Sequence, residues 1–399
     1  MKPATSTGQL VYDLLIRHGH LWRRLSVSER MVLGCTSRAD HRHRAWEPRH
    51  CSLRITDEGI EFCAIEGDLH FFSERRQNLL RPGQLCFVGQ IPVICVARST
   101  SRWGTMVALG PYRSACARSW SQIAEAIVFA RSNLSVLIQG PSGTGKELVA
   151  RIIHQSSPRS SGPFVAINCA AIAPGLIESE LFGARKGAFT GAVADRKGAF
   201  QRAAGGTLFL DELGDLSASA QAALLRAIDT GQLQTVGGAT TQADVRVVAA
   251  THRDLQAMVQ SGNFRLDLLH RIAVCSVQTY PLKERLVDQL CLLQDWLDRN
   301  LPSGIESVLA QHHWPGNVRE LKNVGHRIDC QHPFGPLSIQ MFCKAIDVAQ
   351  APIDKRAWVE SCIEHSRSTA DAFRSSGLPR STFFRYLKQL KDCPRAGVS

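Results

Sequence analysis

The sequence predicts a multidomain protein in which a small β-sandwich precedes an α/β domain with a largely parallel sheet, followed by a helix-turn-helix. Three observations predict this order. Short apolar runs separated by turn residues come first, and apolar strands then alternate with amphipathic helices. The C-terminal end reads as three helices with a glycine turn. We therefore expect domains at 1–105, 115–330 and 353–399.

The composition fits a multidomain, basic protein. The chain has 399 residues, a formal net charge of +12 and a pI of about 9.3, and this charge favours a polyanionic partner such as nucleic acid over a merely solvated basic surface. The sequence has no run of about 18 apolar residues, which a transmembrane helix would need. It also lacks the pattern of a signal peptide. The 13 cysteines are scattered and never spaced C-x-x-C, which favours reduced thiols. We expect a cytoplasmic protein that is not in a membrane.

The β-sandwich is expected from three short runs with half-polar alternation, at 52–55, 60–65 and 92–97. Turn signals rich in Gly, Pro and acidic residues separate these runs. The polar stretch 98–114 follows them and is expected to be a linker.

A glycine-rich loop is the clearest chemical motif. It follows an apolar strand at 134–138 and opens an amphipathic helix, which makes a chance glycine turn a poor alternative. Its backbone N–H groups would wrap phosphates, and Lys146 would supply a charge. Glu147 stands where Ser or Thr usually helps to hold Mg²⁺. The expected nucleotide-binding residues of the loop are Gly140, Pro141, Ser142, Gly143, Thr144, Gly145, Lys146 and Glu147.

Two further strands end in polar residues that suit a nucleotide site. The strand at 207–210 ends in Asp211 and Glu212. Asp211 would contact Mg²⁺ on the nucleotide, directly or through water, and Glu212 would polarise the attacking water. The strand at 245–250 ends in Thr251, next to His252. A polar side chain there could sense the γ-phosphate, and a locally satisfied threonine is an equal alternative.

The C-terminal helices suit DNA binding. Gly377 makes a turn before a last helix at 379–391, which has an apolar stripe on one side and basic residues on the other. Such a helix fits the major groove, and a helical bundle for dimerisation is the alternative. The expected DNA-binding residues are Arg380, Ser381, Thr382, Arg385 and Lys388.

With these residues in view, the chain resembles the bacterial enhancer-binding proteins, which are AAA+ activators of sigma-54 RNA polymerase. The motifs occur in the order of that family. They are GPSGTGKE (140–147, Walker A), GAFTGA (187–192), GGTLFLDE (205–212, Walker B), FRLDLLHR (264–271), WPGNVREL (314–321) and, more loosely, the Fis-like GLPRSTFFRYLKQL (377–390).

The resemblance implies an AAA+ P-loop ATPase with a helical lid, in which Glu147 is the usual residue. It implies that Asn168 pairs with Glu212 and switches it with nucleotide state. Arg319 on the lid would be the sensor II arginine. Arginines that reach the nucleotide of a neighbouring subunit would stabilise charge on the γ-phosphate, so hydrolysis would require a ring. The implied catalytic residues are Lys146, Asp211, Glu212, Asn168, Arg265 and Arg271, with Asp211 at the metal.

The hexapeptide lies between the two nucleotide motifs and has no nucleotide chemistry of its own. The resemblance implies that it contacts sigma-54 through Gly187, Ala188, Phe189, Thr190, Gly191 and Ala192. The implied protein uses ATP and Mg²⁺, assembles as a ring, expected to be a hexamer, and binds enhancer-like double-stranded DNA. Hydrolysis would remodel the closed complex of sigma-54 RNA polymerase into an open one.

Two positions depart from the family pattern. Gln201 stands where an acidic residue is common, and Thr235 stands where an arginine is common. Losing both members of a pair avoids an unpaired charge. We therefore hypothesise a compensated loss that alters the coupling between hydrolysis and the hexapeptide loop.

The N-terminal region faintly resembles a forkhead-associated domain. Its phosphopeptide site is expected to be degenerate, because Cys35 and Glu47 stand where arginine and serine are usual. The domain would then bind a regulatory partner that the sequence does not identify. Two rival functions remain for the whole chain: a DNA-binding repressor that has lost its motor, and a general AAA+ remodeller.

Overall fold

The computed structural model describes residues 12–350 except 19–20, 28–29, 35–40, 43–49, 66–68, 72–77, 89 and 189–193, together with Leu387. The chain divides into two compact units, Met1–Arg299 with Leu309–Lys322 and Asn300–Val308 with Asn323–Ser399. The predicted DNA-binding residues Arg380, Ser381, Thr382, Arg385 and Lys388 lie outside the described residues, as do Phe189, Thr190, Gly191 and Ala192.

The chain begins with a β-rich region of mainly antiparallel sheets. One sheet has the order β12-β11-β10-β1-β2, with β9 on β10 and β7 on β9, and the other has the order β4-β3-β5-β6-β8. The predicted strands at 52–55, 60–65 and 92–97 are confirmed as β5, β6 and β10. The strands are β1 (Tyr12–His18), β2 (Leu21–Ser26), β3 (Arg30–Gly34), β4 (His41–Arg42), β5 (Cys51–Thr56), β6 (Gly59–Ala64), β7 (Leu69–Phe71), β8 (Leu79–Leu80), β9 (Leu85–Val88), β10 (Ile91–Ser101), β11 (Gly104–Leu109) and β12 (Tyr112–Ser114).

The predicted linker at 98–114 is wrong, because these residues complete the larger sheet. Strand β10 runs to Ser101, and β11 and β12 follow as antiparallel neighbours. The polar run that reads as a loop is the end of a long strand, where Ser99 pairs with Met106. A polar run can form a strand when the neighbouring strand supplies the apolar side chains, because strand propensity depends on the packing context.

The larger sheet is buried on both faces. Leu14 and Ile16 of β1 enter an apolar core shared with β5 and β6 of the other sheet, and Leu15 faces the opposite way. That opposite face packs on α1 (Ala117–Ala130), whose Trp120 and Ile123 belong to the same apolar cluster as Leu15. A strand buried on both faces reads as a continuous apolar run. The β-rich region therefore shares a core with the domain that follows.

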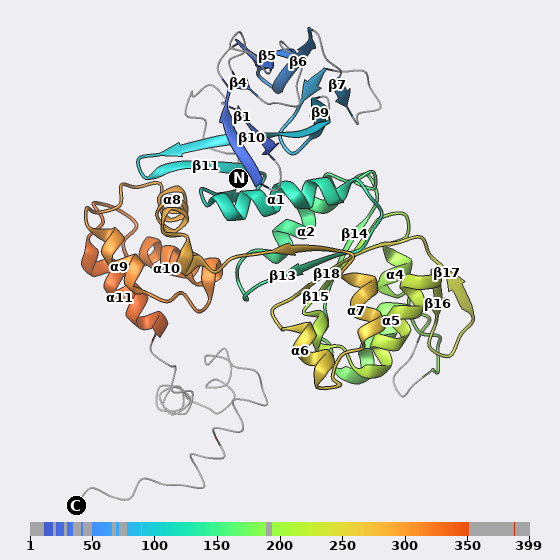
Figure 1. Cartoon of the computed structure of the whole chain (residues 1–399). Helices are drawn as coiled ribbons and strands as arrows, with labels where there is room; N and C mark the ends of the chain where they lie inside the picture. Colours follow the sequence, from blue (N-terminus) through green and yellow to red (C-terminus); the bar gives the residue numbers. More distant parts are fainter. Residues whose placement is uncertain are drawn as a thin grey trace, which may run out of the picture. The chain divides into compact units, whose positions relative to one another are not determined.

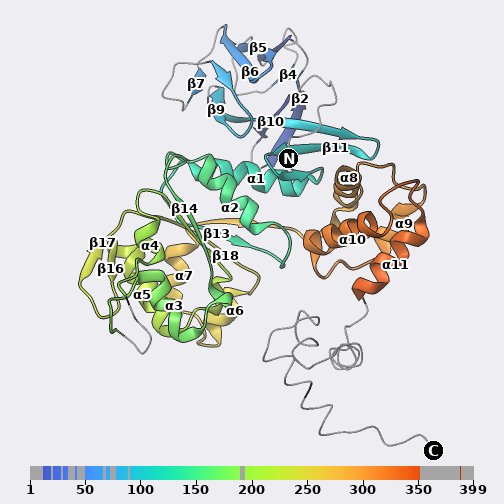
Figure 2. The same cartoon turned by 180° about the vertical axis from the view of Figure 1, so that it is seen from behind.

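The next domain is the expected α/β domain, with five parallel strands in the order β14-β15-β18-β13-β19. Helices α1 and α2 lie on one face of the sheet, and α3, α4, α5 and α7 pack on the other (Figures 1 and 2). The strands are β13 (Val136–Gln139), β14 (Phe164–Asn168), β15 (Thr207–Asp211), β18 (Arg246–Thr251) and β19 (Cys275–Gln278), with the hairpin β16 (Gln232–Gln234) and β17 (Thr240–Gln242). The helices are α2 (Lys146–Gln155), α3 (Ile177–Phe182), α4 (Ala199–Arg202), α5 (Ala218–Thr230), α6 (Leu255–Gln260), α7 (Leu266–Ile272) and α8 (Leu286–Leu297), with 3₁₀ turns at Cys169–Ala171, Pro174–Leu176, Leu213–Asp215 and Leu282–Glu284.

Alternation within the strands sends side chains to both faces. Val136 and Ile138 face α1 and α2, whereas Leu137 faces the other layer of helices. Strand β13 lies between β18 and β19, which are not its neighbours in sequence. Such a change in strand order opens a crevice at the carboxyl ends of the strands, where open α/β sheets bind ligands. The P-loop leaves β13 at this crevice.

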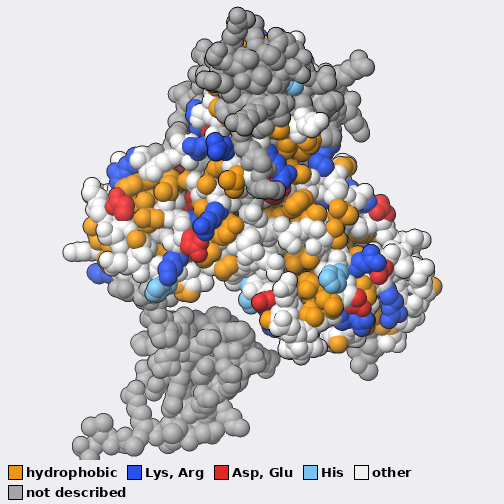
Figure 3. Space-filling model, in the orientation of Figure 1, with side chains coloured by type: hydrophobic (Ala, Val, Ile, Leu, Met, Phe, Trp, Pro, Cys, Tyr) orange, Lys and Arg blue, Asp and Glu red, His pale blue; other side chains and the backbone are white. Residues whose placement is uncertain are grey.

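The remaining helices of the described residues are α9 (Ile305–Gln311), α10 (Asn317–Gln331) and α11 (Ile339–Gln350). The Arg327 guanidinium donates to the carbonyl of Ala345 and joins α10 to α11. Every helix among the described residues is too short or too polar to cross a membrane. On the face in Figure 3, the described Lys and Arg side chains are interspersed with acidic and hydrophobic ones.

Candidate functional site

The P-loop has the backbone that phosphate binding requires. Gly140, Gly143 and Gly145 have φ angles of 147°, 77° and 100°, a region that side-chain-bearing residues rarely adopt. A Cβ at Gly140 would lie 2.1 Å from Thr279 Oγ1, and one at Gly143 would lie 2.2 Å from a carbonyl oxygen of the lid. Both positions therefore need glycine for space as well as for conformation.

Lys146 lies at the start of α2 with its side chain nearly buried. Its Nζ donates to the carbonyls of Gly140 at 3.0 Å and Pro141 at 3.3 Å. Burial lowers the pKa of Lys146, and the nearby carboxylates Glu212 and Asp211 partly oppose this. The ammonium group is thus held over the loop by weak carbonyl contacts that phosphate oxygens could replace.

The acidic pair lies at the tip of β15, next to the P-loop. Glu212 Oε1 is 4.0 Å from Lys146 Nζ, and Glu212 has a left-handed backbone with φ of 52°. Burial, and then the charge of Glu212, raise the pKa of Asp211. Two carboxylates in this setting are suited to a compensating cation.

The other predicted residues of the strand tips have local partners. Asn168 lies opposite Asp211 in the register of β14 and β15, and its Oδ1 accepts from the N–H groups of Ala170 at 3.0 Å and Ala171 at 3.2 Å. Among the described contacts it has none with Glu212. Thr251 is buried, and its Oγ1 accepts from the N–H of Arg253 at 3.0 Å.

Glu147 is exposed and is paired within its own helix. Its Oε1 accepts from Arg151 Nη2 at 2.8 Å on the exposed side of α2. The contact joins residues four apart in one helix, so its contribution to stability is small. The charge of Glu147 still contributes, after burial and Glu212, to raising the pKa of Asp211.

The start of α10 lies against the P-loop. Asn317 Nδ2 donates to the carbonyl of Ser142 at 2.8 Å, and Arg319 Nη1 is 3.5 Å from Ser142 Oγ. The N–H of Val318 donates to the carbonyl of Gly143 at 3.0 Å. Arg319, the predicted sensor II arginine, therefore lies at the P-loop. Its contact with Ser142 is longer than that of Asn317.

Thr279 is a site residue that sequence reasoning missed. It follows β19, is nearly buried, and its Oγ1 lies 2.7 Å from Thr144 Oγ1. No motif surrounds Thr279 in the sequence. Its position beside the P-loop follows from the pairing of β13 with β19.

The two predicted arginines of the α7 segment are exposed and paired within the subunit. Arg265 Nη2 contacts Asp267 Oδ2 at 2.7 Å, and Arg271 Nε contacts Asp229 Oδ1 at 2.8 Å. Neither arginine contacts its own P-loop among the described contacts. An exposed position is what an arginine that acts on another subunit requires.

The residues that flank the hexapeptide form a hydrogen-bonded base. The N–H of Arg185 donates to the carbonyl of Val236 at 3.0 Å, and the N–H of Lys186 donates to Asp195 Oδ1 at 2.8 Å. Glu180 of α3 contacts Arg196, which forms an isolated bridge with Ala184, at 2.5 Å. Of the six residues, only Gly187 and Ala188 are described.

Gln201 and Thr235, which depart from the family pattern, both lie near this base. Gln201 Oε1 accepts from the N–H of Gly198 at 2.9 Å. Thr235 is buried, and its carbonyl accepts from the N–H of Gly238 at 3.0 Å. Because both side chains are neutral, neither position holds a buried charge that would need an oppositely charged partner.

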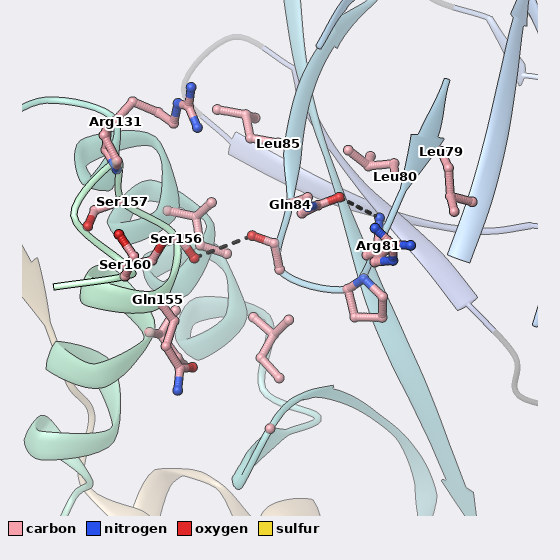
Figure 4. A pocket seen from close by; sticks show the side chains of 18 residues that line it. Leu79, Leu80, Arg81, Gln84, Leu85, Arg131, Gln155, Ser156, Ser157 and Ser160 are labelled. Carbon is pink, nitrogen blue, oxygen red and sulfur yellow. Dashed lines mark hydrogen bonds between the residues drawn. The ribbon is translucent and has the colours of Figure 1, made fainter. Parts of the chain in front are cut away.

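A cavity of about 650 Å³ lies away from these groups, between the turn 81–84 of the β-rich region and the end of α2 (Figure 4). Ser156 Oγ donates to the carbonyl of Gly83 at 3.3 Å across it. No residue of the P-loop or of the acidic pair lines it.

A P-loop, an acidic strand tip and a lid helix that contacts the loop define the AAA+ class of nucleoside triphosphatases. The family model of the sigma-54 interaction domain matches residues 113–278, and that of the AAA+ ATPase lid domain matches residues 282–357. The chain belongs to the sigma-54-dependent activators, the bacterial enhancer-binding proteins.

Individual relatives agree with this assignment. The structure of NtrX from Brucella abortus in complex with ATP is 31% identical, with a TM-score of 0.54, and the match covers 71% of this chain and 69% of that one. The chain is 40% identical over 286 residues to the acetoin dehydrogenase operon transcriptional activator AcoR of Bacillus subtilis, covering 65% of this chain and 47% of AcoR. It is 50% identical over 207 residues to the DNA-binding transcriptional regulator NtrC of Azospirillum brasilense, covering 49% of this chain and 43% of NtrC. The chain thus spans less than half the length of these two curated relatives.

Proposed function

We propose that the chain is an ATP-hydrolysing transcription activator that remodels sigma-54 RNA polymerase from a closed to an open promoter complex. One observation carries the proposal. The same α/β domain holds a P-loop beside an acidic pair and a hexapeptide segment whose flanking residues form a hydrogen-bonded base. The family membership supplies the target on which that segment would act.

The site residues fit ATP with Mg²⁺. The P-loop N–H groups and Lys146 would bind the β- and γ-phosphates, which would replace the carbonyl partners of Nζ. Asp211 would hold Mg²⁺ together with phosphate oxygens and water, as this ion prefers few protein carboxylates. The raised pKa of Asp211 supports this fit, because a cation would relieve the repulsion from Glu212. Glu212 would polarise the attacking water.

Hydrolysis would be completed by a neighbouring subunit in a hexameric ring. Arg265 and Arg271 are exposed and lie outside the P-loop site of their own chain. An arginine supplied by another subunit would stabilise charge that develops on the γ-phosphate. Arg319 beside Ser142 would couple the position of the lid to the nucleotide.

The nucleotide state would reach the hexapeptide through α3. The Glu180–Arg196 contact ties this helix to the segment that follows the hexapeptide. Phe189 and Thr190 would then be presented to sigma-54 or withdrawn from it.

The two ends of the chain would supply targeting and regulation. The predicted helix-turn-helix in 353–399 would bind enhancer-like DNA, in keeping with the basic charge of the chain. The N-terminal sandwich would be a degenerate forkhead-associated domain that binds a regulatory protein. Its sharing of an apolar core with α1 supports a direct effect on the ATPase domain.

ATPase activity with and without DNA, measured beside open-complex formation on a sigma-54 promoter, separates this proposal from its rivals. We expect hydrolysis by the wild-type chain, stimulated by enhancer-like DNA, and loss of hydrolysis in Lys146→Ala. A protein that binds DNA but never hydrolyses ATP would instead be a repressor without a motor. Hydrolysis with no effect on sigma-54 promoters would favour a general remodeller.

A further inference from the structure

The cavity in Figure 4 lies apart from the nucleotide site. Its volume of about 650 Å³ is that of a small-molecule site, since such sites typically enclose about 300–1,000 Å³. One wall comes from the β-rich region, at 79–85 and 109–110, and the other comes from the ends of α1 and α2 and the segment 157–161. Both walls belong to the same compact unit of the chain. The cavity therefore joins the β-rich region to the ATPase domain.

The lining of the cavity is basic. The described residues that line it include two arginines and four serines, and none of them is acidic. Arg131 caps the end of α1 on the side of the helices, and Arg81 lies on the side of the strands, where it pairs with Glu58 outside the lining. Burial lowers the pKa of Arg131, so an anionic oxygen would replace hydration that its charged form has lost. Such a lining selects a ligand with an anionic group.

The serines supply polar contacts around this charge. Ser156 Oγ donates to the carbonyl of Gly83 at 3.3 Å, a long bond that a ligand oxygen could replace. Ser160 and Ser161 line the cavity and are exposed. Apolar lining residues such as Ile127 are buried in the core, so the surface that a ligand meets is largely polar. Hydroxyl groups donate as well as accept, and they suit phosphate or carboxylate oxygens.

The ends of α1 and α2 oppose an anion less than free helix ends would. Unsatisfied carbonyls give a helix C-terminus its partial negative charge. At the end of α1, Arg246 donates to the carbonyls of Phe129 and Ala130. At the end of α2, the carbonyl of His154 accepts from both the N–H and the hydroxyl of Ser157. Because these carbonyls have donors, the lining arginines determine the sign of the local charge.

Helix α2 connects the cavity to the P-loop. Lys146 is its first residue and Ser156 is its C-cap, and the 10 residues between the loop and the cap span about 15 Å. Val149 and Ile153 fix the helix in the apolar core, so α2 would move as a rigid element. A ligand that displaces its end would therefore shift Lys146 relative to the bound phosphates.

We propose that this cavity is a regulatory site for a small metabolite with a phosphate or carboxylate group, which Arg131 binds. Occupancy of the cavity changes ATP hydrolysis through α2. The effect on hydrolysis rests on the proposed ATPase activity, whereas the binding of the metabolite does not.

Calorimetric titration of the whole chain, with ADP and Mg²⁺ filling the P-loop, tests the binding. Ribose 5-phosphate is the phosphate probe and succinate is the carboxylate probe. We expect at least one of them to bind with a Kd below about 1 mM, and Arg131→Gln to weaken that binding by about tenfold or more. The probe that binds identifies the anionic group. Arg226→Gln removes the same charge from an exposed position on α5 and serves as the matched control.

Two results would overturn the site. One is that neither probe binds with a Kd below about 1 mM. The other is an equal Kd for Arg131→Gln and the wild-type chain, which would place the binding elsewhere. Ser160→Trp is a second variant that leaves both arginines in place and fills the exposed side of the cavity. It should block binding without lowering the unfolding midpoint, and unchanged binding by this variant would also contradict the proposal.

The regulatory effect has its own measurement. The probe that binds should change kcat/KM for ATP by about fivefold or more in the wild-type chain, and it should have no such effect on Ser160→Trp. Binding without any change in hydrolysis would contradict the regulatory role. If the wild-type chain hydrolyses no ATP, the proposed function fails, while the titration still decides whether the site exists.

Discussion

The hydroxyl of Ser114, the last residue of β12, donates to the buried carboxylate of Asp288 in α8 at 2.7 Å. The same carboxylate accepts from the N–H of Ala115 at 2.6 Å and faces Arg285 at 3.2 Å. Burial raises the pKa of Asp288, and Arg285 partly opposes the shift. One side chain thus joins the end of the β-rich region to the helix that follows the parallel sheet.

Replacing this carboxylate should destabilise the protein. We expect Asp288→Ala to lower the free energy of unfolding by about 2–4 kcal/mol, because Ser114 and Arg285 would be left buried without it. Asp295→Ala is the matched control, since Asp295 pairs with Arg113 nearer the surface of the same helix. Urea unfolding of both variants checks the difference, and equal effects would contradict a special role for Asp288.

Arg246 is a second buried charged residue, and it binds backbone carbonyls at the end of α1. It is almost fully buried, and it donates to the carbonyls of Ala130 at 2.8 Å, Phe129 at 2.9 Å and Leu134 at 3.3 Å. Burial lowers its pKa to about 10, so it stays charged at neutral pH. The guanidinium group therefore satisfies the carbonyl end of α1, where a cation is also favoured by the helix dipole.

We expect Arg246→Met to cost about 2–4 kcal/mol of unfolding free energy, because it leaves the carbonyls at the end of α1 without donors. Arg246→Lys should cost less, since one ammonium group keeps part of the bonding. Chemical denaturation measures both variants. A loss below ~0.5 kcal/mol for Arg246→Met would show that water replaces the guanidinium without penalty.

The comparison of sequence with structure shows which features local patterns reveal. The P-loop, the acidic pair and the lid motif could be found because each is a short motif whose partners are fixed by strand order. Thr279 could not be assigned, because its contacts depend on a strand neighbour distant in sequence. The strands β11 and β12 were missed for a related reason. They are defined by their pairing with neighbouring strands, and their polar residues show no periodic pattern.

His154 should make stability depend on pH. Its Nδ1 lies 3.0 Å from Thr207 Oγ1, and its ring packs on Phe164. Burial, and then Arg246 and Arg151, lower the pKa of His154 below its ordinary value of 6.5. A lowered folded-state pKa gives stability that is present above the unfolded pKa and is lost as the pH falls through the folded one.

We therefore expect the wild-type chain to lose stability below about pH 6.5, with His154 contributing at most ~1.4 kcal/mol per pH unit. His154→Gln should have a flatter profile over this window. Unfolding at pH 7.5, 6.5 and 5.5 compares the two. Identical slopes would show that His154 keeps the same affinity for protons when the chain folds.

The neutral pair at the base of the hexapeptide offers a test of coupling. Thr235→Arg alone should reduce promoter opening, because it buries a charge without a partner. Combining it with Gln201→Glu should restore part of the loss. Assays of open complexes and of ATPase activity on the same preparations check this, and equal activity of the single and double variants would contradict a compensated pair.

The central claim is that hydrolysis at the P-loop is delivered to sigma-54 through the hexapeptide. Formation of open complexes on a sigma-54 promoter, measured beside ATPase activity, tests it most directly. We predict that Thr190→Ala keeps ATPase activity within about twofold but loses open complexes by at least ~100-fold, whereas Lys146→Ala loses both activities. Full promoter opening by Thr190→Ala would contradict the account, since the hexapeptide would then not be the part that acts on sigma-54.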